Sequence, residues 1–301
     1  MSNKLIVVLG ATGTQGSSVV TALLKDGKYA IRAITRNLDS PAAAALRDQG
    51  VEVVSANIVD KDSLIKAFDG AYAVFGVTIP YTQDSEELQG RNIVDAAKAA
   101  GVPLLVWSSL PGAAESSNGK YTTIAPFDQK RAVDKYIETA GQPTVILHAG
   151  SFAENLLSFG LLIPDSASPG HWTITYPMAP ESKMGGIWIG GDLGNIVVAV
   201  IKHWDDASWR QRLTKEPIVA APYERSANIM VDTIQKVTGK DVKYVRQTDL
   251  PALQKAFFDW ADDGFYTFPD QSSMREELGI KTHSFEDYVR EVVIPYFQSQ
   301  E

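Results

Sequence analysis

The chain has 301 residues, of which 45% are hydrophobic and 21% charged, and its formal net charge at pH 7 is -8. This acidic balance gives no bulk electrostatic argument for binding nucleic acid or an anionic membrane. Because there is no cysteine, disulfides, thiolate catalysis and zinc–thiolate sites are excluded. The four histidines are scattered without metal-ligand spacing, so we expect no metal site. The N-terminus lacks the apolar run of a signal peptide, and we expect a cytoplasmic protein.

Strands and helices alternate through the first half of the chain. Short apolar runs predict strands at Lys4–Gly10, Ala30–Thr35, Val51–Ala56, Ala71–Val77, Pro103–Ser109 and Pro143–Ala149. The stretches between them predict helices at Gln15–Lys25, Pro41–Gln49, Ser63–Phe68, Glu86–Ala100 and Phe127–Thr139. This order predicts an α/β fold of Rossmann type, a doubly wound parallel sheet covered by helices on both faces.

The composition changes after Gly150, where proline, serine and glycine become frequent and short strands mix with helices. We therefore expect a Rossmann domain over residues 1–155 and a smaller α+β lobe over residues 156–301. The stretch Gly190–Trp204 is predicted to be a helix with Asp192 as its N-cap. We expect this helix to pack with the first domain.

A glycine motif follows the first predicted strand and opens the first predicted helix. Gly10, Gly13 and Gly16 have the spacing G-x-x-G-x-x-G, in the context that a dinucleotide-binding turn requires. Glycines allow the tight turn and the close approach of a pyrophosphate, while the helix N-terminus offers free N–H groups. The alternative is a tight turn without a ligand, but its place at the start of six strands favours cofactor binding.

The second predicted strand ends in an arginine where NAD-binding proteins have a carboxylate for the ribose hydroxyl. Arg36 occupies this place and Asn37 follows it. A guanidinium suits a ribose 2′-phosphate because it can donate two charge-assisted hydrogen bonds. The sequence therefore favours NADP(H) over NAD(H), the alternative being a solvated loop arginine.

Four segments together resemble the NmrA-like family of atypical short-chain dehydrogenases/reductases. They are GATGTQG, ITRN, PFDQKRAVDKYI and SFAENLL, and they look colinear with the family over nearly the whole chain. The branch most similar is the redox-sensor type that binds NADP(H).

The resemblance implies a set of cofactor contacts. The glycine turn with Thr12, Thr14 and Gln15 would bind the pyrophosphate, and Arg36 with Asn37 the adenosine phosphate. Further contacts follow the dinucleotide from adenine to nicotinamide: Asn57 and Ile58 at adenine, Thr78, Ile79 and Pro80 along the ribose and pyrophosphate, Lys130 at the nicotinamide ribose, and Phe152, Ala153, Glu154 and Asn155 at the nicotinamide.

The chain departs from the usual short-chain reductase at one position. Those enzymes have Tyr-x-x-x-Lys, with the tyrosine as acid, but here Pro126 stands four residues before Lys130. Another acid is needed for reduction. The candidates are Lys130, Ser108, Ser109, Tyr121 and His148. His148 stands where the related sensors have an arginine, and the alternative for it is a structural role as a buried histidine at the end of a strand.

Two functions fit these observations. The first is an NADPH-dependent reductase that transfers hydride to a carbonyl, enone or imine carbon of a small hydrophobic substrate between sheet and lobe. The second is a catalytically silent NADP(H) sensor that binds a protein partner, favoured by the missing tyrosine. No direct nucleic-acid or membrane partner is expected, while a homodimer, and a nuclear location for the sensor, stay open.

Overall fold

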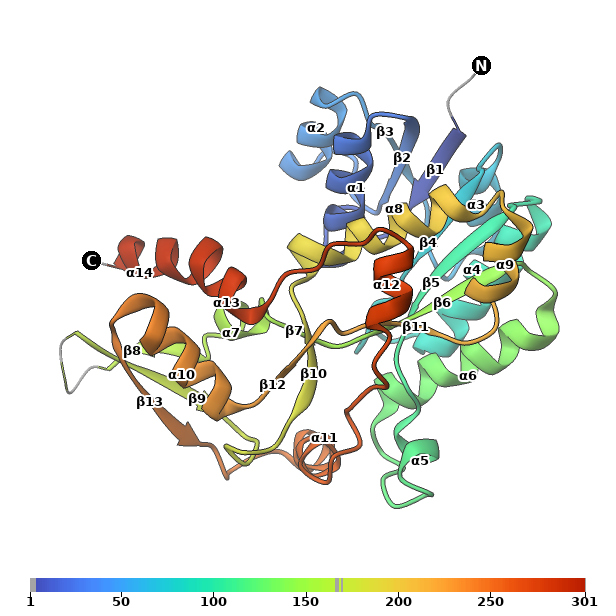
Figure 1. Ribbon diagram of the computed structural model, residues 1–301. Coiled ribbons are helices and arrows are strands. Elements are labelled where there is room, and N and C mark those ends of the chain that lie inside the picture. Colours follow the sequence, from blue (N-terminus) through green and yellow to red (C-terminus); the bar gives the residue numbers. More distant parts are fainter. Residues whose placement is uncertain (1–3, 166–167, 169, 301) are drawn as a thin grey trace.

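The computed structural model describes residues 4–165, 168 and 170–300 (Figure 1). Its largest element is a seven-stranded sheet, all parallel, in the order β11-β6-β5-β4-β1-β2-β3. The strands are β1 (Lys4–Val8), β2 (Tyr29–Thr35), β3 (Glu52–Ser55), β4 (Ala73–Gly76), β5 (Leu104–Ser109), β6 (Thr144–Ala149) and β11 (Ile218–Ala220). The strand order reverses at β1, which places a crevice at the carboxyl ends of β1 and β4.

Helices cover both faces of this sheet, and a separate hydrophobic core is buried between the sheet and the helices on each face. One core lies under α1 (Thr14–Asp26), α2 (Pro41–Asp48), α8 (Gly194–His203) and α9 (Ala207–Leu213). The other lies under α3 (Lys61–Phe68), α4 (Glu86–Ala99) and α6 (Ala125–Ala140). Strands buried on both sides need apolar residues throughout, which explains their near-continuous hydrophobic runs. The predicted doubly wound Rossmann sheet is confirmed.

Helices α1 and α8 lie side by side although the chain separates them widely (Figure 1). The Ser18 hydroxyl donates to the carbonyl of Ile189 (2.5 Å) and accepts from the N–H of Gly194 (3.0 Å). A Cβ on Gly194 would lie 2.2 Å from the carbonyl oxygen of Ser18, so only glycine allows this approach. Thus α8 and β11, both beyond residue 155, complete the layers of the large sheet.

The remaining chain forms the smaller α+β lobe. It has two three-stranded sheets, β12-β10-β7 and β13-β9-β8, and an aromatic core that includes Trp172 and Trp260. Its strands are β7 (Ser151–Phe152), β8 (Leu162–Pro164), β9 (His171–Tyr176), β10 (Met184–Ile187), β12 (Tyr223–Arg225) and β13 (Asp241–Arg246). Its helices are α5 (Ala113–Ser116), α7 (Asn155–Ser158), α10 (Ala227–Thr238), α11 (Ala252–Asp262), α13 (Phe285–Tyr288) and α14 (Ile294–Gln300), with a π-helical turn η2 (Val289–Val293) between the last two. Helix α12 (Ser272–Glu277) instead packs against the core of the large sheet through Met274.

The helix predicted at Gly190–Trp204 begins differently from the prediction. A π-helical turn, η1 (Ile189–Leu193), precedes α8, and Asp192 lies within it, fully buried. Its Oδ1 accepts from the N–H of His283 (3.0 Å) and lies 2.8 Å from Nδ1 of that ring. The Glu154 carboxylate instead accepts from the first N–H groups of the turn, those of Ile189 and Gly190 (3.3 and 2.8 Å). The prediction of Asp192 as N-cap is wrong, because a side chain from another segment takes those donors.

Among the described residues, no helix combines the length and apolarity needed to cross a membrane.

Candidate active site

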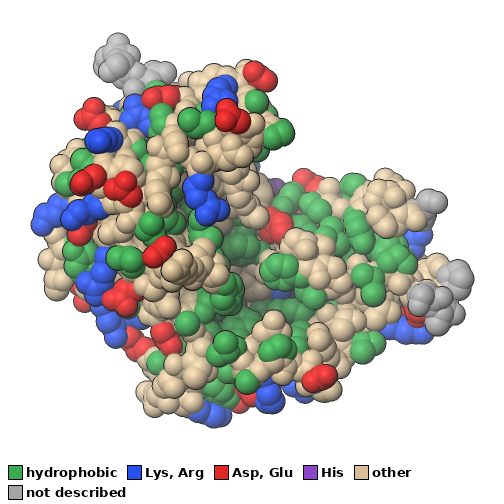
Figure 2. Space-filling view, turned by 180° about the vertical axis from the view of Figure 1, so that it is seen from behind, with side chains coloured by type: hydrophobic (Ala, Val, Ile, Leu, Met, Phe, Trp, Pro, Cys, Tyr) green, Lys and Arg blue, Asp and Glu red, His purple; other side chains and the backbone are tan. Residues whose placement is uncertain are grey.

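Figure 2 shows a hollow between the sheet-bearing part and the smaller lobe, with hydrophobic side chains gathered along it. The segments that follow β1, β4, β5 and β6 contain most of the residues predicted to be functional. In a parallel sheet, the carboxyl ends of neighbouring strands lie at one edge. The sequence-predicted residues are therefore placed at this edge by the fold.

The glycine turn connects β1 to α1 at the centre of that edge. Gly10 has a φ of +60°, and its carbonyl accepts from the N–H of Gly13 (2.8 Å). A Cβ on Gly16 would lie 2.2 Å from the same carbonyl oxygen. Gly13 is the N-cap of α1 and gives no side-chain hydrogen bond, and the first turn contains no acid. The N-terminal N–H groups of α1 are thus left for an anionic group, next to the exposed Thr12 and Thr14.

A pocket of about 430 Å³ lies at the ends of β2, β3 and β4. Four predicted cofactor residues line it: Arg36, Asn57, Ile58 and Ile79. Within the described ranges no hydrogen bond or ion pair occupies the Arg36 guanidinium, so it can receive an anion. The direct chain neighbours of these residues among the predicted contacts, Asn37, Thr78 and Pro80, lie outside the lining. The Asn37 side chain instead accepts from the N–H of Asp39 (3.0 Å) and turns the chain towards α2.

Gln89 organises the rim of this pocket and was missed by the sequence analysis. Its amide oxygen accepts from the N–H of Ile79 (2.8 Å). Its amide nitrogen donates to Thr82 Oγ1 and to the carbonyls of Ile79 and Asp84, each at 3.0 Å. The Gln89 side chain is buried, whereas its partners Thr82 and Asp84 are exposed, so these bonds connect the protein interior to the rim. A glutamine on the inner face of a predicted helix was the signal available.

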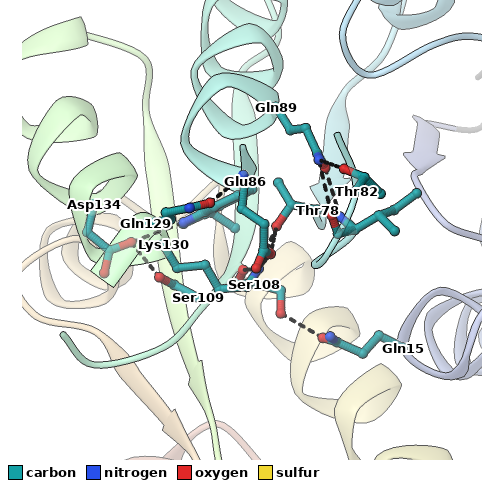
Figure 3. Close-up of polar contacts among 12 residues, drawn as sticks. Gln15, Thr78, Thr82, Glu86, Gln89, Ser108, Ser109, Gln129, Lys130 and Asp134 are labelled. Atoms are coloured by element: carbon teal, nitrogen blue, oxygen red, sulfur yellow. Dashed lines mark hydrogen bonds and ion pairs between the residues drawn. The ribbon is translucent and has the colours of Figure 1, made fainter. Parts of the chain in front are cut away.

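A cluster of buried polar residues surrounds Lys130, which lies one turn into α6 (Figure 3). The Nζ atom donates to Thr78 Oγ1 (2.7 Å) and to the carbonyl of Ser108 (3.3 Å), and it lies 3.1 Å from Glu86 Oε2. The Thr78 hydroxyl donates to the same Glu86 oxygen (2.5 Å). Burial lowers the pKa of the Lys130 ammonium, while Glu86 opposes this shift. The ammonium is therefore surrounded by three acceptors. Because its pKa is lowered, it releases a proton more readily than an exposed lysine.

The site is joined to the glycine turn by one hydrogen bond. The Ser108 hydroxyl donates to Gln15 Oε1 (2.6 Å), while the carbonyl of the same serine accepts from Lys130. Gln15 belongs to the first turn of α1, and Ser108 to the end of β5. Two groups of predicted residues, one for cofactor and one for catalysis, are thus brought into contact (Figure 3).

A second network forms around Asp134, one turn after Lys130. Its carboxylate is fully buried and accepts from Ser109 Oγ (2.7 Å) and Trp107 Nε1 (3.0 Å). His148 Nε2 lies 3.0 Å from its other oxygen, because β5 and β6 pair with Ser109 opposite His148. Two of the predicted acids, Ser109 and His148, are therefore joined through a carboxylate that the sequence analysis did not identify.

The other predicted residues lie further along the edge. Tyr121 donates to Asp263 Oδ2 (2.6 Å), which also pairs with Lys120, so it contacts the smaller lobe rather than the Lys130 group. Phe152 pairs with Ile187 in the small sheet, and Ala153 is buried beside it. Glu154 is bound to the N–H groups of η1 as described, and Asn155 begins α7. In the part of the chain that the structure describes, no three metal-binding side chains converge.

The comparisons with known proteins identify the family. The family model described as NmrA-like matches residues 2–296. The chain belongs to the NmrA-like family. The NmrA-like family domain-containing oxidoreductase cpsB of Aspergillus campestris is 32% identical over 267 residues, which are 82% of this chain and 76% of that protein. The resemblance inferred from the four sequence segments is confirmed.

Solved structures share the fold of this NmrA-like protein at low identity. NmrA, a negative transcriptional regulator crystallised with NADP, is 20% identical with a TM-score of 0.82, over 100% of this chain and 98% of that one. The NADPH-dependent quinone oxidoreductase QOR2 of Escherichia coli, crystallised with NADPH, is 22% identical with a TM-score of 0.73, over 96% and 99% of the two chains. At such identities the likeness establishes the common architecture alone.

Proposed function

We propose that this NmrA-like protein is an NADPH-dependent reductase that transfers hydride to a carbonyl, enone or imine carbon of a small hydrophobic substrate. Its support begins with relatives such as cpsB, which are named oxidoreductases. Structures of similar fold include a regulator bound to NADP and a quinone reductase bound to NADPH. In this proposal residues 1–155 supply most cofactor contacts, and residues 156–301 form most of the far wall of the substrate site.

The residues at the sheet edge fit a dinucleotide phosphate. The uncapped N-terminus of α1, next to Thr12 and Thr14, suits the pyrophosphate. The Arg36 guanidinium, without a partner among the described residues, suits the ribose 2′-phosphate. The pocket between Asn57, Ile58 and Arg36 has the volume and the mixed lining that an adenosine end requires.

The observation that most supports reduction is the contact of the glycine turn with the lysine site. Gln15 touches Ser108, and Ser108 touches Lys130, so an acid lies within two contacts of the cofactor turn. The bound NADPH would supply the hydride to the substrate carbon. The π electrons of the C=O or C=N bond then move to the heteroatom, which takes a proton from Lys130 Nζ. The lysine is left neutral and regains its proton from solvent.

Burial makes Lys130 suitable for this step. Burial lowers the pKa of the Lys130 ammonium below its ordinary value, and an ammonium with a lowered pKa transfers its proton more readily. Lys130 thus replaces the tyrosine that is absent at Pro126. Ser108 and Ser109 each donate their one hydroxyl proton within the protein, to Gln15 and to Asp134, so either serine would donate to the substrate only by giving up that bond. His148, with a side chain 13% exposed, is the member of the Asp134 network nearest solvent.

A regulatory function is the second candidate, supported by Pro126 and by the fold shared with NmrA. Proline at the second position of α6 starts the helix but has no proton to give. A sensor would bind NADP(H) and change its contacts with a protein partner, which requires a different affinity for two conformations.

Turnover separates these two functions. The test is NADPH oxidation, followed by absorbance, with a panel of quinones, enones, imines and aromatic ketones, together with calorimetric binding of NADPH and NADP⁺. The reductase predicts binding and acceptor-dependent oxidation. Tight binding without oxidation across the panel contradicts it and supports the sensor.

A further inference from the structure

Glu86 lies where a helix begins but is turned away from solvent. Ser85 caps α4 by accepting from the N–H of Leu88 (3.1 Å), which makes Glu86 the first helical residue. A carboxylate at that position is favoured by the positive end of the helix dipole and is commonly solvated. Here the Glu86 side chain is only 3% exposed, whereas its neighbour Glu87 is 39% exposed and pairs with Arg91.

The backbone of Glu86 is fixed from the helix that contains Lys130. Its N–H donates to Gln129 Oε1 (2.6 Å), and Gln129 directly precedes Lys130 on α6. The side chain is then bound by Thr78, which contacts both Glu86 and Lys130. The carboxylate and the ammonium are therefore set relative to one another by two independent connections.

The charges around Lys130 leave Glu86 as its direct counter-ion. From α6 itself, Asp134 acts on the ammonium through space, but its oxygens are occupied by Ser109, Trp107 and His148. From β5, the Ser108 carbonyl accepts a hydrogen bond, and the Trp107 ring lies 5.1 Å from Nζ. From α4, Glu86 alone brings a full negative charge within 4 Å.

The two carboxylate oxygens of Glu86 have different surroundings. Oε2 accepts from the Thr78 hydroxyl and lies 3.1 Å from Lys130 Nζ. Oε1 is buried and has no hydrogen-bond partner among the described residues. The polar contacts of the Glu86 side chain are therefore those with Thr78 and Lys130.

We infer that Glu86 is a positioning residue that, with Thr78, keeps the Lys130 ammonium protonated and directed at the sheet edge for proton transfer to the substrate. This inference rests on the proposed reductase function. The ammonium has three N–H groups, and its three acceptors are Thr78 Oγ1, Glu86 Oε2 and the Ser108 carbonyl. The longest of these contacts, 3.3 Å to Ser108, is the one that a substrate oxygen or nitrogen would replace.

The test compares Glu86→Gln with Glu87→Gln, which removes a neighbouring but exposed carboxylate of the same helix turn. The first readout is the titration of Lys130 in protein labelled with ¹³C-lysine, its signal assigned with Lys130→Met. Removing an opposite charge at this distance should lower the titration midpoint by about 1–3 pH units. Glu87→Gln should leave it unchanged, and Glu86→Asp should restore part of the shift.

The second readout is the pH dependence of NADPH oxidation. The rate should fall at alkaline pH as Lys130 loses its proton, and the midpoint of this fall should be lower in Glu86→Gln than in the parent by the same interval of about 1–3 pH units. If Lys130 titrates identically in Glu86→Gln and Glu87→Gln, the inference is overturned whether or not the protein reduces any substrate. If the titration shifts but no variant turns over, the proposed function fails while the role of Glu86 towards Lys130 stands. Thermal unfolding of each variant shows whether the fold is retained.

Discussion

Replacing Lys130 and Glu86 singly and together should reveal a strong energetic coupling. The pair is 9% and 3% exposed with atoms 3.1 Å apart, so Lys130→Met leaves a buried carboxylate without its counter-ion. Breaking such a pair from one side costs about 3–5 kcal/mol, and the hydrogen bond that Glu86 keeps with Thr78 places Lys130→Met near the lower figure. Glu86→Gln leaves an uncompensated ammonium with two remaining acceptors, and we expect about 2–3 kcal/mol.

The double variant removes both charges at once. Because neither ion is then buried alone, its loss should be smaller than the sum of the two single losses by about 2 kcal/mol or more. The assay is urea unfolding followed by tryptophan fluorescence, with free energies extrapolated to water. The matched control is the exposed pair Glu87–Arg91 on the same helix, for which we expect a coupling below about 0.5 kcal/mol. Additive losses at Lys130 and Glu86 would refute the buried ion pair.

Three further predictions concern the cofactor edge and a surface network. Arg36→Ala should weaken NADPH binding by about 1–3 kcal/mol, the value of charge-assisted hydrogen bonds, and leave NADH binding nearly unchanged, as measured by calorimetry; equal NADPH affinity removes Arg36 from the site. Gly16→Ala places a Cβ 2.2 Å from the Gly10 carbonyl and should cost about 1–3 kcal/mol of unfolding free energy as well as NADPH affinity, whereas Gly13→Ala, with 3.4 Å to the same atom, should fold like the parent. The pKa of Glu115 is lowered from 4.5 to about 2 by two basic side chains of α6, so its stabilisation should be present above pH 4.5 and disappear as the pH falls towards 2. The melting temperatures of the parent and of Glu115→Gln should therefore converge over that interval, and a constant difference contradicts the assignment.

The sheet and its helices could be predicted from the sequence because each depends on local patterns. Apolar runs of strand length and amphipathic stretches gave the order of elements, and the observed helix Lys61–Phe68 differs from the predicted one only in its first turn. That turn begins at Lys61 because the Asp60 side chain caps it, accepting from the N–H groups of Asp62 and Ser63. The glycine turn and the role of Arg36 could be proposed from the sequence as well, because both interpretations depend only on the position of these residues directly after a predicted strand.

The buried networks could not be predicted because their partners belong to different elements that only tertiary packing brings together. Asp134 and His148 meet only once α6 folds onto β6, and Asp192 meets His283 across 91 residues. Glu86 carried a misleading local signal, because an acidic residue after a capping serine is normally a solvated partner of the helix dipole. Glu87 behaves in that way, and only tertiary packing decides which of the two faces α6.

The measurement that most directly tests proton donation by Lys130 compares NADPH oxidation by the parent with that by the Lys130→Met/Glu86→Gln double variant. This variant buries no unpaired charge at the site and should fold, so a change in turnover reports the chemistry. With the best acceptor of the panel and saturating NADPH, kcat should fall by about 10²–10⁴-fold, the range for loss of a positioned general acid. Turnover equal to the parent would contradict the role of Lys130 and return the proton donor to Ser108, Ser109 or His148.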